Sequence, residues 1–294
     1  MGYVISVAML IGIYSLLAVG FNLESGHAGL TNLGFVGVYA IGAYTTALLS
    51  LHGLPWPIST LIALAPSLFA AYLLGWATLH LTDDYFAIVT LGFAEAVQTS
   101  LTGVSAAGGV YGLVGIPTMF GDFPAAQQYL QVAFVFLVLG AIVVANAILV
   151  RSDYGCLLRA AKANVTAARA LGKRTPSLRR SALLIGAVPA SLAGSIYALY
   201  IGYLSPTAFG SSLTFLIVAA VALGGSSITG ALLGAAVFVG GNQIIQYVTS
   251  GGLNSNGVLF AQLDVVAMGV VLLGIVLFRR SGILPFKEPS RLAE

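Results

Sequence analysis

Residues 128–150 read QYLQVAFVFLVLGAIVVANAILV, an uncharged and largely apolar run that ends directly at Arg151. About 20 consecutive apolar residues suffice for an α-helix to cross the hydrocarbon core of a bilayer. The run therefore predicts a membrane-spanning helix. Comparable runs occur at residues 2–22, 28–50, 58–80, 85–103, 181–203, 230–250 and 258–278, and a shorter one covers residues 212–224. Together they predict an all-α fold, a polytopic membrane helix bundle of about 8–9 transmembrane helices.

The composition of the whole chain also indicates a membrane protein. Of 294 residues, 59% are hydrophobic and 7% are charged, whereas a soluble globular domain has about 25% charged residues. This difference excludes a water-soluble globular protein, a disordered chain and a nucleic-acid-binding protein. The single cysteine, Cys156, excludes a disulfide framework, and no metal-ligand spacing occurs in the sequence. No stretch is polar enough for a separate soluble domain, so residues 1–294 are expected to form one domain.

Basic residues are confined to two segments of the chain. None of the 12 lysines and arginines precedes Arg151; they lie between Arg151 and Arg180 or in the tail from Arg279 onward. Because basic loops stay in the cytoplasm, residues 151–180 and the tail 279–294 are both expected to be cytoplasmic. An even number of crossings must then join them, and counting residues 212–224 as a crossing gives four. Five crossings precede Arg151, which predicts a multi-pass protein of the cell membrane with its N-terminus outside.

Glycines predict two discontinuous helices. Residues 25–37 and residues 224–230 interrupt apolar runs with several glycines and polar residues. Broken helices at membrane depth are tolerated where they are buried or line a cavity, and transporters often bind substrate at such breaks. Small residues also allow close helix packing in membranes. We assign structural roles to Gly34, Gly42, Gly224, Gly225, Gly230 and Gly234.

Residues 156–173 predict an amphipathic basic helix between two spans. Its basic face would carry Arg159, Lys162, Thr166, Arg169 and Lys173, and its apolar face Leu157, Ala161, Val165, Ala168 and Leu171. Such a helix either rests on anionic lipid or docks into a groove of a cytoplasmic partner. The chain lacks the G-x-x-x-x-G-K-[ST] phosphate loop, so an energy-converting partner is expected.

Several segments in order resemble one known family. They are Gly29–Tyr44, Asp84–Glu95 (DYFAIVTLGFAE), Gly112–Pro117 (GLVGIP), the stretch from Gly155 through Leu158-Arg159-Ala160 to Leu171-Gly172, Ser205-Pro206 and Gly224-Gly225. The chain resembles permease subunits of the branched-chain amino acid ABC importers, of the LivM type, over most of its length. It departs from the family at residues 29–35, GLTNLGF, where many relatives have a serine and a histidine.

The resemblance implies a function and a set of partners. The implied protein is the transmembrane permease subunit of an ATP-driven importer that moves branched-chain, hydrophobic amino acids inward by alternating access. Implied partners are two cytoplasmic ATPase subunits, a second and different permease subunit, an extracytoplasmic solute-binding protein and membrane lipid. The chain itself would be no enzyme and would bind no cofactor, with ATP and Mg held by the ATPases. The implied ATPase-docking residues are Arg159, Lys162, Asn164, Arg169, Gly172 and Arg179.

Polar residues inside the spans are candidates for the substrate path, because ionisable groups within spans rarely face lipid. The candidates are Asn22, Asn32, Glu95, Gln98, Asn242, Gln243 and Asp264. Each could instead form a hydrogen bond between helices.

Other functions remain open at this point. A permease of the same family for urea or short amides is one alternative. A proton-coupled secondary transporter that titrates Glu95 or Asp264 is another, and amide substitutions at both positions would abolish its transport. An intramembrane enzyme is the third, but none of the histidines pairs with a nucleophile at helical spacing.

Overall fold

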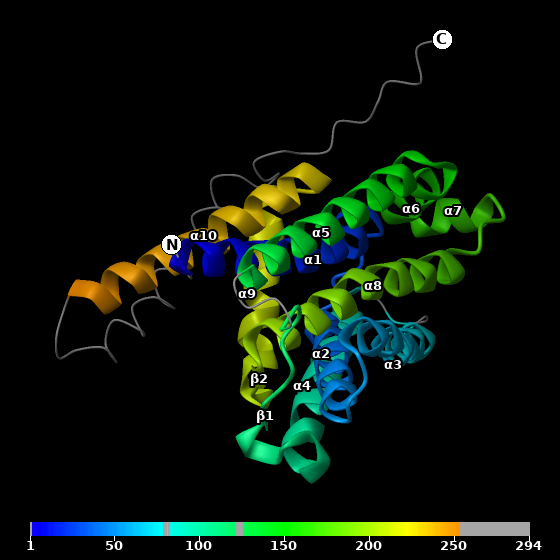
Figure 1. The fold of residues 1–294 in the computed structure, drawn as a ribbon. Coiled ribbons are helices and arrows are strands. Elements are labelled where there is room, and N and C mark those ends of the chain that lie inside the picture. The colour runs from blue at the N-terminus through cyan, green and yellow to red at the C-terminus, as the bar shows by residue number, and fades with distance from the viewer. Residues whose placement is uncertain (1, 79–80, 82, 122–125, 253–294) are drawn as a thin grey trace.

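The computed structural model describes residues 2–78, 81, 83–121 and 126–252 (Figure 1). The helices are α1 (Gly2–Asn22), α2 (Phe35–Leu51), α3 (Trp56–Thr78), α4 (Asp83–Gly103), α5 (Gln127–Arg151), α6 (Asp153–Ala163), α7 (Val165–Ala170), α8 (Thr175–Ile201), α9 (Ser211–Gly224) and α10 (Ile228–Gly252). A π-helix, Leu23–His27, extends α1, and short 3-10 helices cover Ser105–Ala107, Gly109–Tyr111 and Pro206–Phe209. The predicted span at residues 258–278 and the tail 279–294 lie outside the described residues.

The all-α membrane bundle is confirmed. Five helical stretches in the described part of the chain are long and apolar enough to cross a membrane: 3–27, α3, α5, α8 and 206–224. A sixth candidate span results if α4 and the 3-10 helices after it, which are bent by 92° relative to α4, are counted as one span. Helix α2 and residues 228–243 of α10 are apolar but shorter. The number of about 8–9 crossings stays a prediction.

Helix α8 lies at the centre of the bundle. It packs against α1, α2 and α3, and it is the most buried of the candidate spans. Helix α1 also packs against α5 and α10. The Tyr3 hydroxyl donates to the Gln243 carbonyl and the Asn22 amide to the Ser226 carbonyl, so α1 and α10 run antiparallel. Helix α5 is the least buried candidate span, which leaves most of its surface for lipid or a partner.

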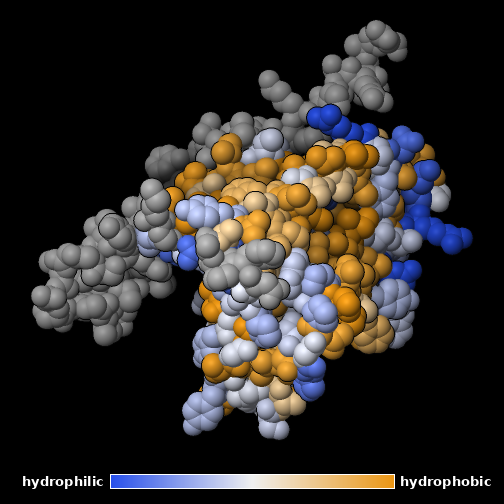
Figure 2. All heavy atoms as spheres, in the orientation of Figure 1, coloured by the Kyte–Doolittle hydropathy of each residue, from blue (hydrophilic) through white to orange (hydrophobic). Residues whose placement is uncertain are grey.

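The bundle has two chemically different ends. Helices α6 and α7 lie at one end, beyond the ends of α5 and α8 (Figure 1). Figure 2 shows hydrophilic residues gathered there and hydrophobic residues over the middle of the molecule. We call this the basic end. At the opposite end, strand β1 (Leu113–Val114) pairs antiparallel with β2 (Tyr203–Leu204). The separation agrees with the expected topology, although which end faces the cytoplasm stays a prediction.

The element at the basic end is two helices, so the single helix predicted over residues 156–173 is wrong. The backbone at Asn164 is extended, with φ −156° and ψ 104°, between α6 and α7. The Asn164 side chain accepts a hydrogen bond from the Ala167 amide at 3.0 Å. An asparagine that caps the N-terminus of a new helix in this way ends the previous one. Leu171, which was assigned to the apolar face of that helix, lies beyond the end of α7 and is 80% exposed.

The second predicted break also has a structural cause. Helix α9 ends at Gly224, and Gly225 adopts a positive φ of 90° before α10 begins. The backbones of the two helices then approach closely, because a Cβ on Gly234 would lie 2.0 Å from the Ala220 carbonyl oxygen. A Cβ on Gly230 would likewise lie 2.2 Å from the Gly224 carbonyl oxygen. These glycines therefore let the chain turn back on itself within the bundle.

Helix packing at Gly42 leads to a stability prediction. A Cβ on Gly42 of α2 would lie 2.7 Å from the carbonyl oxygen and 2.8 Å from the Cα of Ser191 on α8. Gly42→Val should therefore push α2 from α8 and cost about 1–3 kcal/mol, or roughly 2–10 °C in melting temperature. Gly140→Val is the matched control, because nothing lies within 4 Å of that position on α5. Equal melting temperatures for the two variants, by fluorescence size-exclusion after heating, would contradict the close packing.

Candidate functional site

The break between α1 and α2 is buried at the basic end. Helix α1 continues as the π-helix Leu23–His27, and the chain is irregular over residues 28–34. Gly29 has φ 70°, which turns the chain away from the helix axis. Leu30 and Asn32 are 1% and 2% exposed. Single π-helical turns are frequent at functional sites, and the buried backbone groups of this segment need hydrogen-bond partners.

Neighbouring helices supply those partners. The Leu33 amide donates to the Thr90 hydroxyl of α4 at 3.1 Å, and the Leu33 carbonyl accepts from the Thr214 hydroxyl of α9 at 3.3 Å. A Cβ on Gly34 would lie 2.5 Å from the Thr90 carbonyl oxygen. The irregular segment is therefore held between α4 and α9, and movement of either helix would move it.

Glu24 is the centre of a buried polar cluster that the sequence analysis missed. Its side chain is 1% exposed, and Asn32 Nδ2 donates to Glu24 Oε2 at 2.8 Å. Asn32 Oδ1 accepts from the Gly34 amide at 3.0 Å, one residue before α2 begins. Burial of a carboxyl group is costly unless it is hydrogen-bonded. The signal was present in the sequence, since Glu24 is the first charged residue of the chain and directly follows an uncharged span.

Helix α8 is shaped to receive the Glu24 side chain. A Cβ on Gly186 would lie 2.3 Å from Glu24 Oε1, so a larger residue there would displace the carboxyl group from its present position. Among the described residues the ion pair joins Arg179 and Asp83, and Glu24 is not part of one. The carboxyl group thus joins the break to the most buried helix through packing and a hydrogen bond.

The two helix breaks lie against each other. Asn22 is fully buried and its Nδ2 donates to the Ser226 carbonyl at 3.3 Å, in the turn between α9 and α10. A Cβ on Gly26 would lie 3.4 Å from the same carbonyl oxygen. Asn22 Oδ1 has no hydrogen-bond partner within the described part of the chain. Two interruptions about 200 residues apart in sequence therefore form one site.

The other predicted substrate-path residues are not part of this site. Glu95 and Gln98 lie half-buried on α4, where Gln98 approaches Gly210 near the start of α9. Asn242 and Gln243 lie past the middle of α10, beside the N-terminal end of α1, about 25 Å from the breaks. Asp264 is outside the described residues. Of the seven candidates, the structure brings together Asn22 and Asn32.

Lys162 joins helix α6 at the basic end to this site. Its Nζ donates to the carbonyl of Gly26 at 2.7 Å and to that of Ser25 at 3.3 Å. Its stem covers Gly29, where a Cβ would lie 2.7 Å from Lys162 Cγ. Partial burial of the ammonium group lowers the pKa of Lys162 from its ordinary value. Lys162 thus binds the π-helix that carries Glu24.

The other predicted docking residues also have contacts within the chain. Arg159 Nη1 donates to the Val150 carbonyl at 2.8 Å, and Arg169 Nε to the Thr175 hydroxyl at 2.9 Å. Arg179 forms a 3.0 Å ion pair with Asp83. Asn164 caps α7, and Gly172 has φ 75° just beyond its end. These residues position α6 and α7, and they leave the Ala167, Ala170 and Leu171 surface facing outward.

Residues 3–278 match the model of a family described as the permease component of the branched-chain amino acid transport system. The chain belongs to this permease family. The family consists of transport permeases and not of enzymes. Within the described residues of this permease, no group of three or more histidines, cysteines or acids could hold a metal ion.

Individual relatives extend along nearly the whole permease. The high-affinity branched-chain amino acid transport system permease protein LivM of Escherichia coli is 31% identical, over 97% of this chain and 71% of its own length. The Salmonella typhimurium LivM has the same identity and coverage. The probable LivM of Methanocaldococcus jannaschii is 26% identical, over 94% of this chain and 91% of its own. The resemblance inferred from the motifs is therefore confirmed.

Glu24 leads to a second stability prediction for this permease. Glu24→Ala removes the acceptor of Asn32 Nδ2 and leaves space beside Gly186, so it should cost about 2–4 kcal/mol. Glu24→Gln keeps both the volume and an acceptor oxygen and should cost less than half as much. Thermal unfolding of the two purified variants in one detergent measures the difference. Equal losses would mean that an ionised carboxylate, rather than the hydrogen bond and packing, is required.

Proposed function

We propose that this permease is the membrane-spanning half of an ATP-driven importer that moves branched-chain, hydrophobic amino acids inward by alternating access. One observation carries the proposal: the two broken helices meet at one buried site, and Lys162 bonds that site to the cytoplasmic helix α6. Broken helices are where transporters place their substrate sites. The names of the LivM relatives support the substrate class.

The cytoplasmic helices α6 and α7 are proposed to dock on the ATPase subunits. Leu171 is 80% exposed at the end of α7, next to the small side chains of Ala167 and Ala170. A large apolar side chain in such a setting is suited to a pocket of a partner. The residues predicted as docking residues, Arg159, Lys162, Asn164, Arg169, Gly172 and Arg179, would then serve the docking by holding α6 and α7 in place.

The proposed transmission runs from α6 to both breaks. ATP binding and hydrolysis in the partner subunits would move α6, and Lys162 would pull on the π-helix. The Glu24–Asn32 hydrogen bond would carry the movement to the start of α2, and the contact of Asn22 with Ser226 would carry it to α9 and α10. A rigid cluster of this kind moves as a unit because its interior is close-packed.

The remaining partners belong to the proposal as well. A second, different permease subunit would complete the pathway, and a solute-binding protein would deliver substrate at the end that carries β1 and β2. The chain would bind no cofactor itself, since ATP and Mg would be held by the two ATPase subunits. The basic end and the C-terminus would face the cytoplasm, with the N-terminus outside.

The test uses the complex as it exists in the native cell. The tagged chain is purified in mild detergent, its co-purifying proteins are identified, and the complex is reconstituted into vesicles. We expect two ATP-binding subunits and ATP-dependent uptake of labelled leucine, isoleucine or valine. Competition by urea or acetamide, without competition by leucine, would instead support a permease for short amides. ATP-independent uptake by the chain alone, driven by a proton gradient, would overturn the proposal in favour of a secondary transporter.

A further inference from the structure

The outer face of α4 is polar over the second half of the helix. Phe86, Thr90 and Ala94 are buried against the bundle, so the residues on the other side of α4 face outward. No large apolar side chain is exposed in the described stretch 92–103. The exposed residues of this stretch are Gly92, Ala96, Thr99, Ser100 and Gly103, and Glu95 lies half-buried among them. This part of the surface is therefore made of small and polar residues.

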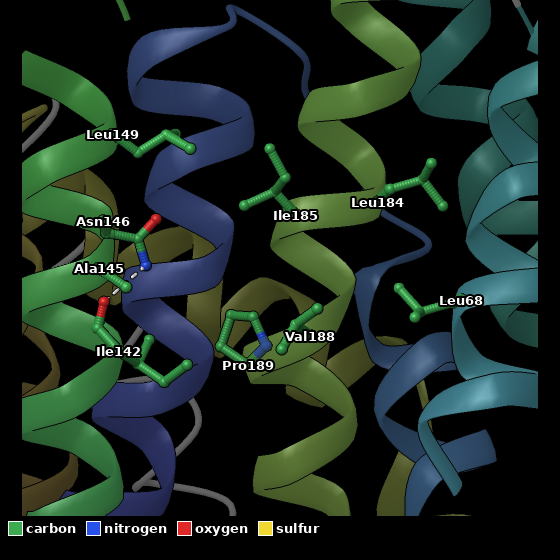
Figure 3. Close-up of a pocket in the computed structure, with 9 residues that line it drawn as sticks. All are labelled: Leu68, Ile142, Ala145, Asn146, Leu149, Leu184, Ile185, Val188 and Pro189. Atoms are coloured by element: carbon green, nitrogen blue, oxygen red, sulfur yellow. Dashed lines mark hydrogen bonds between the residues drawn. The ribbon is translucent and has the colours of Figure 1, made fainter. Parts of the chain in front are cut away.

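Other surfaces of the bundle are apolar. Helix α3 exposes Phe69 and Trp76, and α5 exposes Leu137 and Ile148. Figure 3 shows the groove between α3, α5 and α8, whose lining is apolar except for Asn146. Hydroxyl and carboxyl groups are costly in hydrocarbon. The outer face of α4 therefore suits water or a polar ligand, whereas the other surfaces suit apolar neighbours.

Glu95 lies near the middle of the membrane on this face. Helix α4 has 21 residues and starts at the basic end, where Asp83 pairs with Arg179 at 3.0 Å. Along the helix axis, Glu95 is about 18 Å beyond Asp83 and about 12 Å before Gly103, within a hydrocarbon core about 30 Å thick. Within the described residues the Glu95 carboxylate forms neither an ion pair nor a hydrogen bond. An ionisable group at this depth marks a path for ions or substrate.

Polar side chains lead from Glu95 toward the end of the bundle that carries β1 and β2. Gln98, Thr99 and Thr102 follow Glu95 at intervals of three or four residues, which places them along one side of α4. In the turns on the other side of Glu95, toward the basic end, the exposed side chains are large and apolar: Val89, Ile88 and Tyr85. Glu95 thus lies where a polar surface gives way to an apolar one.

Helix α4 also joins this face to the break between α1 and α2. The Thr90 hydroxyl accepts a hydrogen bond from the Leu33 amide at 3.1 Å, and a Cβ on Gly34 would lie 2.5 Å from the Thr90 carbonyl oxygen. Thr90 and Glu95 are about 7–8 Å apart along the helix axis. A movement of the break would therefore move α4 and the Glu95 carboxylate with it.

We propose that the outer face of α4 is one wall of the translocation pathway and that Glu95 binds the ammonium group of an amino acid in transit. The inference rests on the proposed function and assigns a residue to its substrate. A carboxylate and an ammonium group form short, charge-assisted hydrogen bonds. Helical side chains lean toward the N-terminus, so Glu95 reaches toward Gly92, where nothing lies within 4 Å of an added Cβ. The apolar side chain of the substrate then faces Ile88.

The charge of Glu95 also gives selectivity. Urea and short amides carry no positive charge, so they lack the group that the carboxylate binds. A zwitterion with an apolar side chain matches both the charge and the polar-to-apolar change along α4. Glu95 therefore favours apolar amino acids over neutral amides of similar size.

Leucine uptake by the complete transporter, reconstituted with its solute-binding protein, tests the role of Glu95. Glu95→Gln keeps the size of the side chain and removes its charge. We expect uptake to fall at least about tenfold through loss of a hydrogen bond between charged groups, while the partner subunits still co-purify. Glu95→Asp should restore part of the uptake. Normal uptake by Glu95→Gln would overturn this inference alone, whereas no leucine uptake by the unmodified complex would reject the proposed function and the inference with it.

Two leucine analogues show whether Glu95 recognises the ammonium group directly. Isoamylamine is leucine without its carboxyl group, and isocaproate is leucine without its amino group. We expect an excess of the amine, but not of the acid, to inhibit leucine uptake by the unmodified complex. The residual uptake by Glu95→Gln should be insensitive to the amine. Absence of inhibition by the amine, or equal inhibition of the two complexes, would overturn the assignment of Glu95.

A steric variant tests the wall of the pathway. Gly92→Leu should leave the stability of the chain unchanged, because no other part of the described chain lies within 4 Å of an added Cβ. It should nevertheless abolish uptake by filling the space beside Glu95. Gly140→Leu on α5 is the control, since Gly140 is equally free of neighbours, and it should transport normally. Loss of a co-purifying membrane subunit from Gly92→Leu would overturn the proposal, because this face would then be a contact between subunits.

Discussion

Leu171→Asp is expected to prevent the ATPase subunits from binding to this permease and therefore to abolish uptake. Leu171 is 80% exposed at the end of α7, so the substitution changes the outward surface and not the packing of the chain. A charge in place of an apolar anchor at an interface costs about 2 kcal/mol or more, which is roughly a 30-fold loss of affinity. The measurement is recovery of ATPase subunits with the tagged chain, together with leucine uptake in cells.

Val110→Asp is the control for Leu171→Asp. Val110 is 73% exposed, but it lies in the 3-10 turn Gly109–Tyr111 beyond the far end of α4. It introduces the same charge at a site of similar exposure, away from α7. We expect normal recovery of the ATPase subunits with this variant. Recovery that is equal for the two variants would place the docking surface elsewhere on the permease.

Lys162→Met is expected to uncouple ATP hydrolysis from transport. Methionine keeps an apolar stem over Gly29, while the hydrogen bonds from the ammonium group to Ser25 and Gly26 are lost. Hydrogen bonds from a charged group contribute about 1.5–3 kcal/mol. We therefore expect uptake to fall at least about tenfold while ATPase subunits still co-purify and ATP hydrolysis continues. The measurement compares uptake with ATP hydrolysis in the same vesicles.

The outcome for Lys162→Met decides between two roles for this lysine. Loss of the ATPase subunits would make Lys162 a docking residue, as the sequence analysis expected. Retained subunits with lost uptake would support its role in transmission. Arg151→Met is the control, since it removes another exposed basic side chain at the same end of the bundle. Normal uptake with that variant would show that the effect is specific to the contact with the π-helix.

The sequence predicted the position of the basic segment between two spans, but it predicted one helix where the structure has two. Charge located residues 151–180 between two spans, because basic residues are excluded from the membrane. Helical periodicity then suggested one continuous helix. Asn164 can lie within a helix or cap one, and the sequence alone does not decide which of these occurs. Its capping bond to the Ala167 amide, seen in the structure, separates α6 from α7 and exposes Leu171.

The candidate site was predicted in part. Glycine content indicated both breaks, and Asn22 and Asn32 were singled out because polar groups within spans are costly. Glu24 was missed, although it is the first charged residue of the chain. Asn242 and Gln243 were grouped with the same path only because they are polar, and the antiparallel course of α10 takes them to the far end of α1.

The sequence by itself determined the membrane bundle, the basic segment and the places where helices break. These properties depend on neighbouring residues alone. The free energy of inserting a segment into the membrane is the sum of contributions from its own residues, and a glycine changes the conformational freedom of the backbone at its own position. Only the tertiary structure decided that the two breaks meet, that Gly186 makes room for Glu24 and that Lys162 binds the π-helix. Those contacts join residues more than 100 positions apart, and they depend on the orientation of packed helices that no local pattern encodes.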